Sequence, residues 1–186
     1  MAYRSAERAA LISGSPSPNS KSRALLEHAL ARLFARGFDT TLVDLGSLPA
    51  DALLGRRQDA RVQAALEAVT AAQIVVAGSP VYRASYSGLL KVFFDLLAPE
   101  SLVGKLAVPL LTGGSPAHQL ALEHGLRPLF ASLGATVVPA GVYGCDAQFT
   151  PGPEAALLGR VDRAVDEALM LLRAGYATSD TLTRET

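Results

Sequence analysis

Residues 13–22 combine the chemical groups that bind phosphate. The segment reads Ser-Gly-Ser-Pro-Ser-Pro-Asn-Ser-Lys-Ser, and beyond its first serine it supplies hydroxyls and one ammonium from Ser15, Ser17, Ser20, Ser22 and Lys21. A helix is predicted to begin at Ser20 or Ser22, and the free amides and the dipole at a helix N-terminus attract anions. The alternative is a plain serine- and proline-rich turn whose serine caps the helix. The segment therefore predicts an anion site, with phosphate as its first candidate.

The same segment differs from the established phosphate motifs. It lacks the Gly-Lys-Ser/Thr of a Walker A loop and the second and third glycines of the dinucleotide-binding fingerprint. It has no cysteine that could act as a phosphatase nucleophile. It also has no carboxylates at the end of the preceding strand, which a response-regulator receiver needs. None of these classes therefore fits the segment.

A second candidate loop, residues 78–88, reads Gly-Ser-Pro-Val-Tyr-Arg-Ala-Ser-Tyr-Ser-Gly after an apolar run. Pro80 lacks an N–H and fixes its own φ, so we expect the chain to turn out of the sheet there. The amides of Val81, Tyr82 and Arg83 would then face a planar heterocycle. The alternative is an ordinary loop that carries two half-buried tyrosines.

A third candidate loop, residues 112–118, reads Thr-Gly-Gly-Ser-Pro-Ala-His and also follows an apolar run. Gly113 and Gly114 permit a ligand to approach the backbone closely. The alternative is a tight strand-to-helix turn capped by Ser115. Each loop is ambiguous alone, and the three together favour a ligand site.

The elements that carry these loops follow from the hydrophobic pattern. Apolar runs of strand length alternate with helical patterns five times, which predicts a parallel sheet covered by helices on both faces. The predicted strands are residues 9–13, 38–45, 74–77, 106–111 and 136–142. The predicted helices run from Ser20 or Ser22 to about Arg36, from a cap at Asp59, and over 87–97, 117–133 and 154–174. The remaining segments are expected to be a loop over 46–58 and polar tails at 1–7 and 176–186.

Right-handed crossovers between five parallel strands favour the strand order 2-1-3-4-5. In that order, ligands bind beyond the carboxyl ends of strands one, three and four, next to the point where the order reverses. The three candidate loops follow these strands, so the topology is expected to bring them together. No internal repeat or linker divides the sequence, which predicts a single domain over residues 1–186 with its core at about 9–174.

The composition limits the partners of the chain. Its 186 residues include 17 Lys and Arg against 17 Asp and Glu, a balance that argues against a nucleic-acid surface. No apolar run reaches membrane-spanning length, and the charged N-terminus does not resemble a signal peptide. Cys145 is the only cysteine, which excludes an internal disulfide and leaves too few residues at metal spacing for a zinc site. We expect a soluble cytoplasmic protein without nucleic-acid, membrane or metal partners.

Taken together, the three loops resemble those of the NAD(P)H-dependent FMN reductases in the flavodoxin-like superfamily. The resemblance covers about residues 9–172 and is strongest to the subgroup that serves two-component alkanesulfonate monooxygenases. It implies a flavodoxin-like fold in which Ser15, Ser20 and Ser22 hold the FMN phosphate. It also implies that the isoalloxazine ring contacts Pro80, Val81 and Tyr82, with Thr112, Gly113 and Gly114 along its other edge. His118, at a helix start, is a further candidate to contact the flavin, or it meets only a neighbouring carbonyl.

One departure from the family concerns the phosphate loop. Relatives often carry an arginine near the position of Ser17, and this chain does not. Lys21 is the candidate substitute, as a point charge rather than a bidentate fork. We therefore expect FMN to be held weakly, which suits a reductase that uses flavin as a substrate. Arg83 is a candidate to meet the 2′-phosphate of NADPH.

The implied reaction is hydride transfer from C4 of NADPH or NADH to N5 of the flavin. The cofactor carries the chemistry, so no side chain is assigned a catalytic role, although backbone donors of the third loop would stabilise the reduced anion. Reduced FMN would then pass to a partner monooxygenase. The alternatives are a reductase of quinones, azo dyes or metal ions with tightly bound FMN, a non-catalytic electron-transfer flavodoxin, and a flavin-free binding module.

The predicted helix over 117–133 contains a phase slip. One apolar face is formed by Leu122, Leu126, Leu129, Phe130 and Leu133, and another, about one residue out of phase, by Ala117, Leu120 and Ala121. Pro128 also removes one helical amide. A one-residue insertion near His124, forming a π-bulge, explains both features, whereas the alternative is a helix that ends or kinks at Pro128. The resemblance implies that such a π-helix lies at a homo-oligomer interface, in a dimer or tetramer, with His124 at the inserted position.

Overall fold

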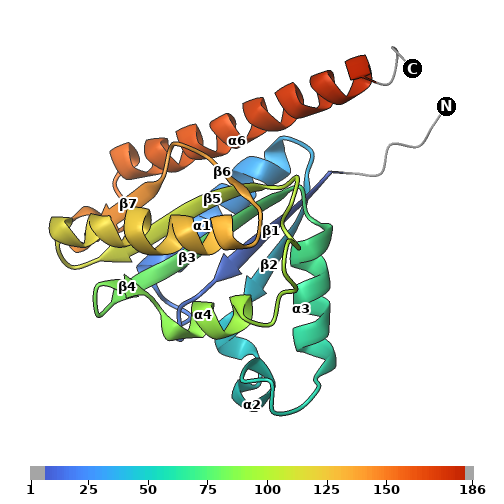
Figure 1. Ribbon diagram of the computed structural model, residues 1–186. Helices are drawn as coiled ribbons and strands as arrows, with labels where there is room; N and C mark the ends of the chain where they lie inside the picture. The colour runs from blue at the N-terminus through green and yellow to red at the C-terminus, as the bar shows by residue number, and fades with distance from the viewer. Residues whose placement is uncertain (1–6, 183–186) are drawn as a thin grey trace.

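The computed structural model describes residues 7–182, with side chains described through residue 175. Its sheet has the order β2-β1-β3-β5-β6, and all of these neighbours run parallel. The strands are β1 (Arg8–Ser13), β2 (Asp39–Asp44), β3 (Ile74–Tyr82), β5 (Leu106–Gly113) and β6 (Thr136–Val137). The predicted fold class, a doubly wound parallel sheet, is confirmed (Figure 1).

The strand order differs slightly from the predicted one at the last strand. The predicted strand over 136–142 is divided into β6 and β7 (Val142–Cys145), and both pair with β5. Val138 still donates its N–H to the carbonyl of Ala107, but Pro139 has no N–H to continue the ladder. The chain loops out over residues 139–141 and rejoins β5 further along. One short strand, β4 (Ser85–Tyr86), pairs antiparallel with the end of β3.

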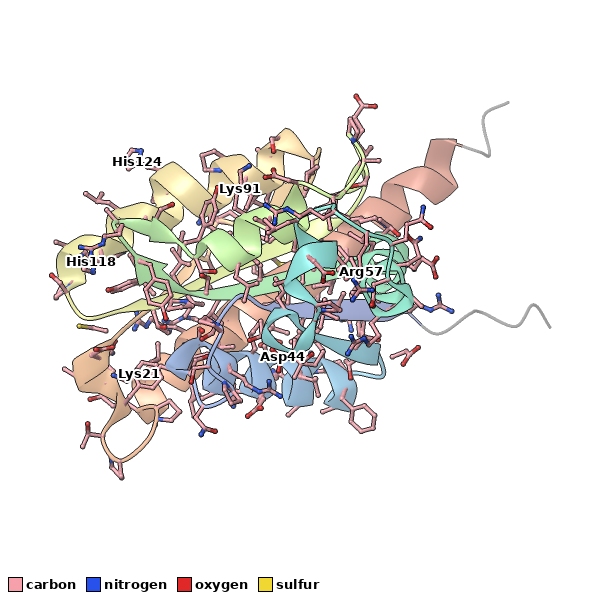
Figure 2. The ribbon with its side chains drawn as sticks, turned by 90° about the horizontal axis from the view of Figure 1, so that it is seen from below. Lys21, Asp44, Arg57, Lys91, His118 and His124 are labelled. Carbon is pink, nitrogen blue, oxygen red and sulfur yellow. The ribbon has the colours of Figure 1, made fainter. Side chains whose placement is uncertain are left out.

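Helices cover both faces of the sheet. One face packs against α1 (Lys21–Ala35) and α6 (Ala155–Leu182), and the other against α3 (Ala60–Ala71), α4 (Gly88–Phe94) and α5 (Arg127–Ser132). Figure 2 shows the two sides, with Lys21 on the α1 side and Lys91 on the α4 side. Along β1, Ala10 and Ile12 belong to the core under α3 and α4, and Ala9 and Leu11 to the core under α1 and α6. Burial on both sides explains why this strand reads as a continuous apolar run.

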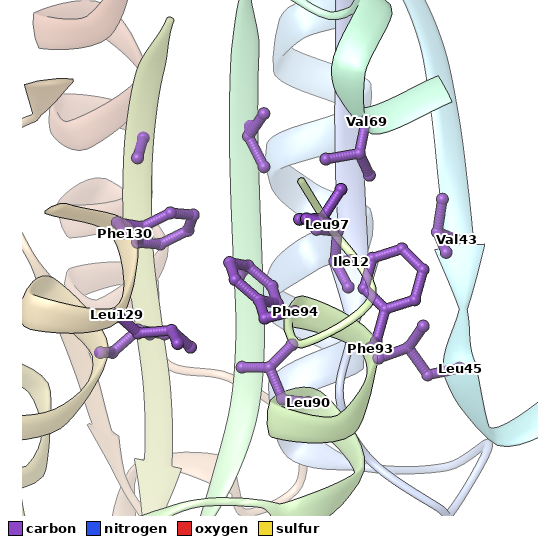
Figure 3. Close-up of a cluster of buried hydrophobic side chains, with 14 of the residues drawn as sticks. Ile12, Val43, Leu45, Val69, Leu90, Phe93, Phe94, Leu97, Leu129 and Phe130 are labelled. Atoms are coloured by element: carbon purple, nitrogen blue, oxygen red, sulfur yellow. The ribbon is translucent and has the colours of Figure 1, made fainter. Parts of the chain in front are cut away.

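An aromatic contact ties α4 to α5 in the first of these cores (Figure 3). The rings of Phe94 and Phe130 meet edge to face, with centroids 5.4 Å apart and an interplanar angle of 75°. Phe93 lies beside Phe94 with centroids 6.3 Å apart. Such pairs contribute about 0.5–1.5 kcal/mol beyond their burial. Because α4 follows the second candidate loop, this packing fixes the base of that loop.

The predicted helix starts agree with the observed caps. The hydroxyl of Ser20 accepts from the N–H of Arg23, and the carboxylate of Asp59 accepts from the N–H of Arg61. Ser87 caps α4 in the same way by accepting from the N–H of Leu90. Each cap satisfies one amide that the first helical turn leaves unpaired.

Two local predictions in this part of the fold were wrong. The segment 46–58 is not only a loop, since α2 (Ala50–Leu53) forms there and buries Ala52 and Leu53. Four residues are too few to show a helical period, so the pattern could not reveal this helix. The last helix continues to Leu182, so part of the predicted C-terminal tail is helical. Predicted tail residues 1–6 and 183–186 lie outside the described part.

No helix within the described residues is long and apolar enough to span a membrane.

The π-bulge predicted near His124 is confirmed. The segment predicted as one helix begins with a 3₁₀ turn, η2 (Pro116–Gln119), and continues with a π-helix, η3 (Leu122–Leu126), and α5. The N–H of Arg127 donates to the carbonyl of Leu122, five residues back, which is the π pattern. Pro128 lies in the first turn of α5, a position where proline is tolerated. The exposed His124 lies in the middle of the π-helix.

Candidate functional site

The three candidate loops meet at the carboxyl edge of the sheet. Ser13 pairs in register with Gly78, Gly78 with Leu110, and Pro80 with Thr112, so β1, β3 and β5 end side by side. The N–H of Gly14 donates to the carbonyl of Gly78 at 2.8 Å, which joins the first loop directly to the second. The loops therefore line one end of the molecule, opposite the start of β1 (Figure 1).

The first loop gathers its hydroxyls at the start of α1. The Ser20 hydroxyl lies 3.2 Å from that of Ser22 and also caps the helix, while Ser22 is fully buried. Ser15 is buried too, and its Oγ accepts from the N–H of Ser17 at 3.1 Å. The exposed Ser17 thus turns its amide back into the loop. Ser20 and Ser22 thus lie together at a helix N-terminus, where free amides attract anions, and Ser15 is buried in the same loop.

Lys21 points toward a segment that the sequence analysis did not include. Its Nζ lies 2.9 Å from Oδ1 of Asp146 and 5.7 Å from the ring centroid of Phe149. Both partners belong to η4 (Asp146–Phe149), the short 3₁₀ helix that follows β7. The only feature of the sequence that could have indicated this segment is its position after the last strand, because residues there also reach the carboxyl edge of the sheet.

The second loop does not leave the sheet at Pro80, contrary to our expectation. Pro80 still pairs in register with Thr112, and β3 continues to Tyr82 before a hairpin leads into β4. The φ of proline is compatible with an extended chain, and its missing N–H is tolerated where the pairing with β5 ends. The hairpin turn, Arg83-Ala84, has φ values of 51° and 64°, as a tight two-residue hairpin requires. Tyr82 and Arg83 are consequently exposed at the rim.

Two buried serines that the sequence analysis missed hold this loop against the first. The Ser79 hydroxyl accepts from the N–H of Ser87 and donates to the carbonyl of Pro80, both at 2.9 Å. The Ser87 hydroxyl donates to the carbonyl of Gly14 and accepts from the N–H of Leu90. The two serines flank the Pro-Val-Tyr motif, but their pairing across eight residues depends on the hairpin, which the sequence pattern did not reveal.

Gly113, in the third loop, lies where side chains from two other strands and η2 converge. A Cβ at this position would lie 2.7 Å from the Tyr143 hydroxyl, 3.3 Å from Cβ of Val81 and 3.4 Å from Nδ1 of His118. Side chains of the protein itself thus approach the backbone closely here, and the close approach of a ligand stays a prediction. Burial raises the pKa of Tyr143, so this group remains a hydroxyl donor. At Gly114 the nearest atom, Oδ2 of Asp146, would lie 3.6 Å from a Cβ.

His118 stands in η2 with its Nδ1 buried. No hydrogen-bond partner for this atom exists among the described residues, and the same is true of the buried hydroxyl of Ser13. Buried polar atoms are normally paired, so an unpartnered one at the edge of a loop cluster suits a bound ligand. The site therefore offers anion-binding groups at the start of α1 and polar groups beside Gly113. This arrangement fits a ligand with a phosphate at one end and a flat polar ring at the other.

The comparison with known families agrees with this geometry. Residues 8–150, which include all three loops, match the family model described as NADPH-dependent FMN reductase. The chain belongs to the NADPH-dependent FMN reductase family. The predicted resemblance is thereby confirmed. The residues present suit FMN, since hydroxyls and helix amides are groups that can bind a phosphate.

Individual FMN reductases of this family resemble the chain over most of its length. An FMN reductase (NADPH) from Pseudomonas putida KT2440 is 38% identical over 138 residues, which cover 74% of this chain and 70% of the relative. The NADH-dependent FMN reductase SfnF of Pseudomonas putida is 38% identical over 167 residues, which cover 86% of this chain and 89% of SfnF. The solved apo structure of an NADH:FMN oxidoreductase has a TM-score of 0.79 at 40% identity, covering 88% and 89%. An archaeal flavodoxin, with 15% identity and a TM-score of 0.63, shares the fold.

Proposed function

We propose that the chain reduces FMN with NADPH or NADH and releases reduced flavin. The observation that carries this proposal is the family match over residues 8–150, because it spans the three loops that the fold brings together. When bound, FMN accepts a hydride from the nicotinamide, so the protein needs only to hold two rings in contact and exclude water. For this reason we assign no catalytic side chain.

The first loop is the proposed phosphate site. Hydroxyls of Ser15 and Ser20 and the first amides of α1 would donate to the phosphate oxygens, and the dipole of this 15-residue helix adds to their effect. Ser22 supports Ser20 through their hydroxyl contact. Ser17 contributes from the rim of the loop, and Lys21 supplies the only positive side chain of residues 13–22.

The second and third loops are the proposed ring site. Pro80, Val81 and Tyr82 lie at the end of β3, and Thr112, Gly113 and Gly114 lie at the end of the neighbouring β5. We assign the unpartnered Nδ1 of His118 to a polar atom of the bound ring. We propose that Arg83, which is exposed at the hairpin tip, meets the 2′-phosphate of NADPH and favours that nucleotide.

We propose that FMN binds weakly, which would favour its use as an exchangeable substrate. The first loop has no arginine, and its one lysine is already paired with Asp146. Relatives are named as NADH-dependent FMN reductases SfnF and SfnE. We infer that this chain supplies reduced FMN, in the cytoplasm, to a partner monooxygenase. We further infer a homo-oligomer, a dimer or tetramer, with the exposed His124 at its interface.

Steady-state oxidation of NADPH and of NADH, followed while FMN is varied, tests the proposal. The expected result is turnover that saturates with added FMN and stops without it. Turnover that needs no added FMN, with flavin retained through purification, would favour the tightly bound reductase of quinones, azo dyes or metal ions. Bound flavin without nicotinamide oxidation would favour an electron-transfer flavodoxin.

A further inference from the structure

The ion pair between Lys21 and Asp146 connects the proposed phosphate loop to the segment after β7. Nζ and Oδ1 are 2.9 Å apart, and the two side chains are 42% and 52% exposed. Because Cys145 pairs in register with Gly113, Asp146 follows directly at the carboxyl edge of the sheet. Its other oxygen faces Gly114, at 3.6 Å from where a Cβ would stand. A carboxylate therefore lies between the loops assigned to the phosphate and to the ring.

Lys21 has no cationic neighbour in its loop that could replace it. It is the only Lys or Arg in residues 13–22. The next cation along the chain, Arg23, is engaged by Glu27 and Asp44, with Nε 2.9 Å from a carboxylate oxygen of Glu27. The side chain of Lys21 is held by η4 through both Asp146 and the ring of Phe149.

A carboxylate in this position opposes the binding of a phosphate in two ways. It neutralises the lysine that would otherwise attract the phosphate, and the phosphate must compete with it for the same ammonium. Exposed ion pairs are weak, so a doubly charged phosphate can displace Asp146, but at a loss of affinity. We propose that Asp146 competes with the FMN phosphate for Lys21 and thereby keeps the flavin exchangeable. This inference rests on the proposed function and adds a residue that sets flavin affinity.

The test compares FMN with riboflavin, which has the ring but no phosphate. Asp146→Asn keeps the side-chain size and removes the charge. At low ionic strength, titration by flavin fluorescence should show FMN bound about three- to tenfold more tightly than by the wild type. The Kd for riboflavin should stay unchanged. The matched control is Asp95→Asn, which removes the same charge from the exposed Lys91–Asp95 pair on α4 and should leave both Kd values unchanged.

A double-mutant cycle shows whether Asp146 acts through Lys21. Lys21→Met should weaken FMN binding, and in that background Asp146→Asn should have no further effect. The proposal is overturned if Asp146→Asn leaves the FMN affinity unchanged or lowers it. It is also overturned if Asp146→Asn tightens the binding of riboflavin as much as that of FMN, or if the gain in FMN affinity persists in the Lys21→Met background. A wild-type chain that binds neither flavin contradicts the proposed function itself, so the two failures are distinguishable.

Discussion

The hydroxyl of Tyr143 on β7 donates to the carbonyl oxygen of Ser115 at 2.6 Å, and this bond spans the third loop. The same hydroxyl would lie 2.7 Å from a Cβ at Gly113. Tyr143 therefore holds the end of the Thr-Gly-Gly segment in place. Position 113 requires glycine because the Tyr143 hydroxyl occupies the space that a side chain there would fill.

Gly113→Ala should disturb this arrangement. The new methyl group must displace the Tyr143 hydroxyl, and overpacking of this kind costs about 1–3 kcal/mol. We expect a lower free energy of unfolding in urea and at least roughly tenfold weaker FMN binding, since the ring site shifts with the loop. Gly114→Ala is the stability control, because its methyl group would meet only Asp146 at 3.6 Å. Equal stability of Gly113→Ala and the wild type would contradict the role given to Tyr143.

Tyr143→Phe should reduce stability by about 0.5–1.5 kcal/mol through the lost hydrogen bond. It should also alter the pH dependence at high pH. Burial raises the pKa of Tyr143 above its ordinary value of 10.0, so the unfolded chain ionises this group before the folded one. The contribution to stability is complete below about pH 10 and is lost as the pH rises through the folded-state pKa. The free energy of unfolding, measured with urea from pH 8 to 11, should therefore fall more steeply for the wild type than for Tyr143→Phe. Parallel curves would show that Tyr143 does not contribute in this way.

Ser20→Ala combined with Ser22→Ala should weaken FMN binding by about tenfold or more while riboflavin binding stays unchanged. The loss of the cap on α1 should also reduce stability by about 1 kcal/mol. Asp59→Ala removes the cap of α3 and should reproduce the stability loss without the effect on FMN. Unchanged FMN affinity in the double variant would show that the phosphate binds elsewhere.

His124→Glu tests the proposed interface. His124 is exposed on the π-helix, so the substitution should leave the stability of the protomer unchanged. Two-fold related copies would bring like charges together. The oligomer should therefore dissociate at a protein concentration at least about tenfold higher than for the wild type, as judged by sedimentation velocity. Phe34→Glu, at an exposed position on α1, is the control and should not change the assembly. An unaltered oligomer would exclude His124 from the interface.

Features that arise from local patterns could be predicted from the sequence. The phase slip between the apolar faces of residues 117–121 and 122–133, together with Pro128, predicted the π-helix near His124, since a one-residue insertion rotates every later side chain. Ser20 and Asp59 could be identified as caps for similar local reasons. The five strand regions followed from apolar runs, and the parallel order then followed from crossover handedness.

Features that depend on contacts between distant segments could not be predicted. The pairing of Ser79 with Ser87 needs the β3–β4 hairpin, whereas the sequence led us to expect that the chain leaves the sheet at Pro80. Asp146 reaches Lys21 only because β7 lies beside β5, and no pattern within either segment indicates it. The division of the last strand depends on Pro139, whose effect shows only once the register with β5 is known.

The activity proposed for this chain is hydride transfer from a nicotinamide nucleotide to FMN. The most direct measurement mixes the protein anaerobically with FMN and NADPH or NADH, and follows the loss of the visible absorbance of oxidised flavin. We predict a rate that increases with protein concentration and saturates with FMN. A rate equal to that of the protein-free mixture, with both nucleotides and at every FMN concentration, would show that the chain does not catalyse this transfer.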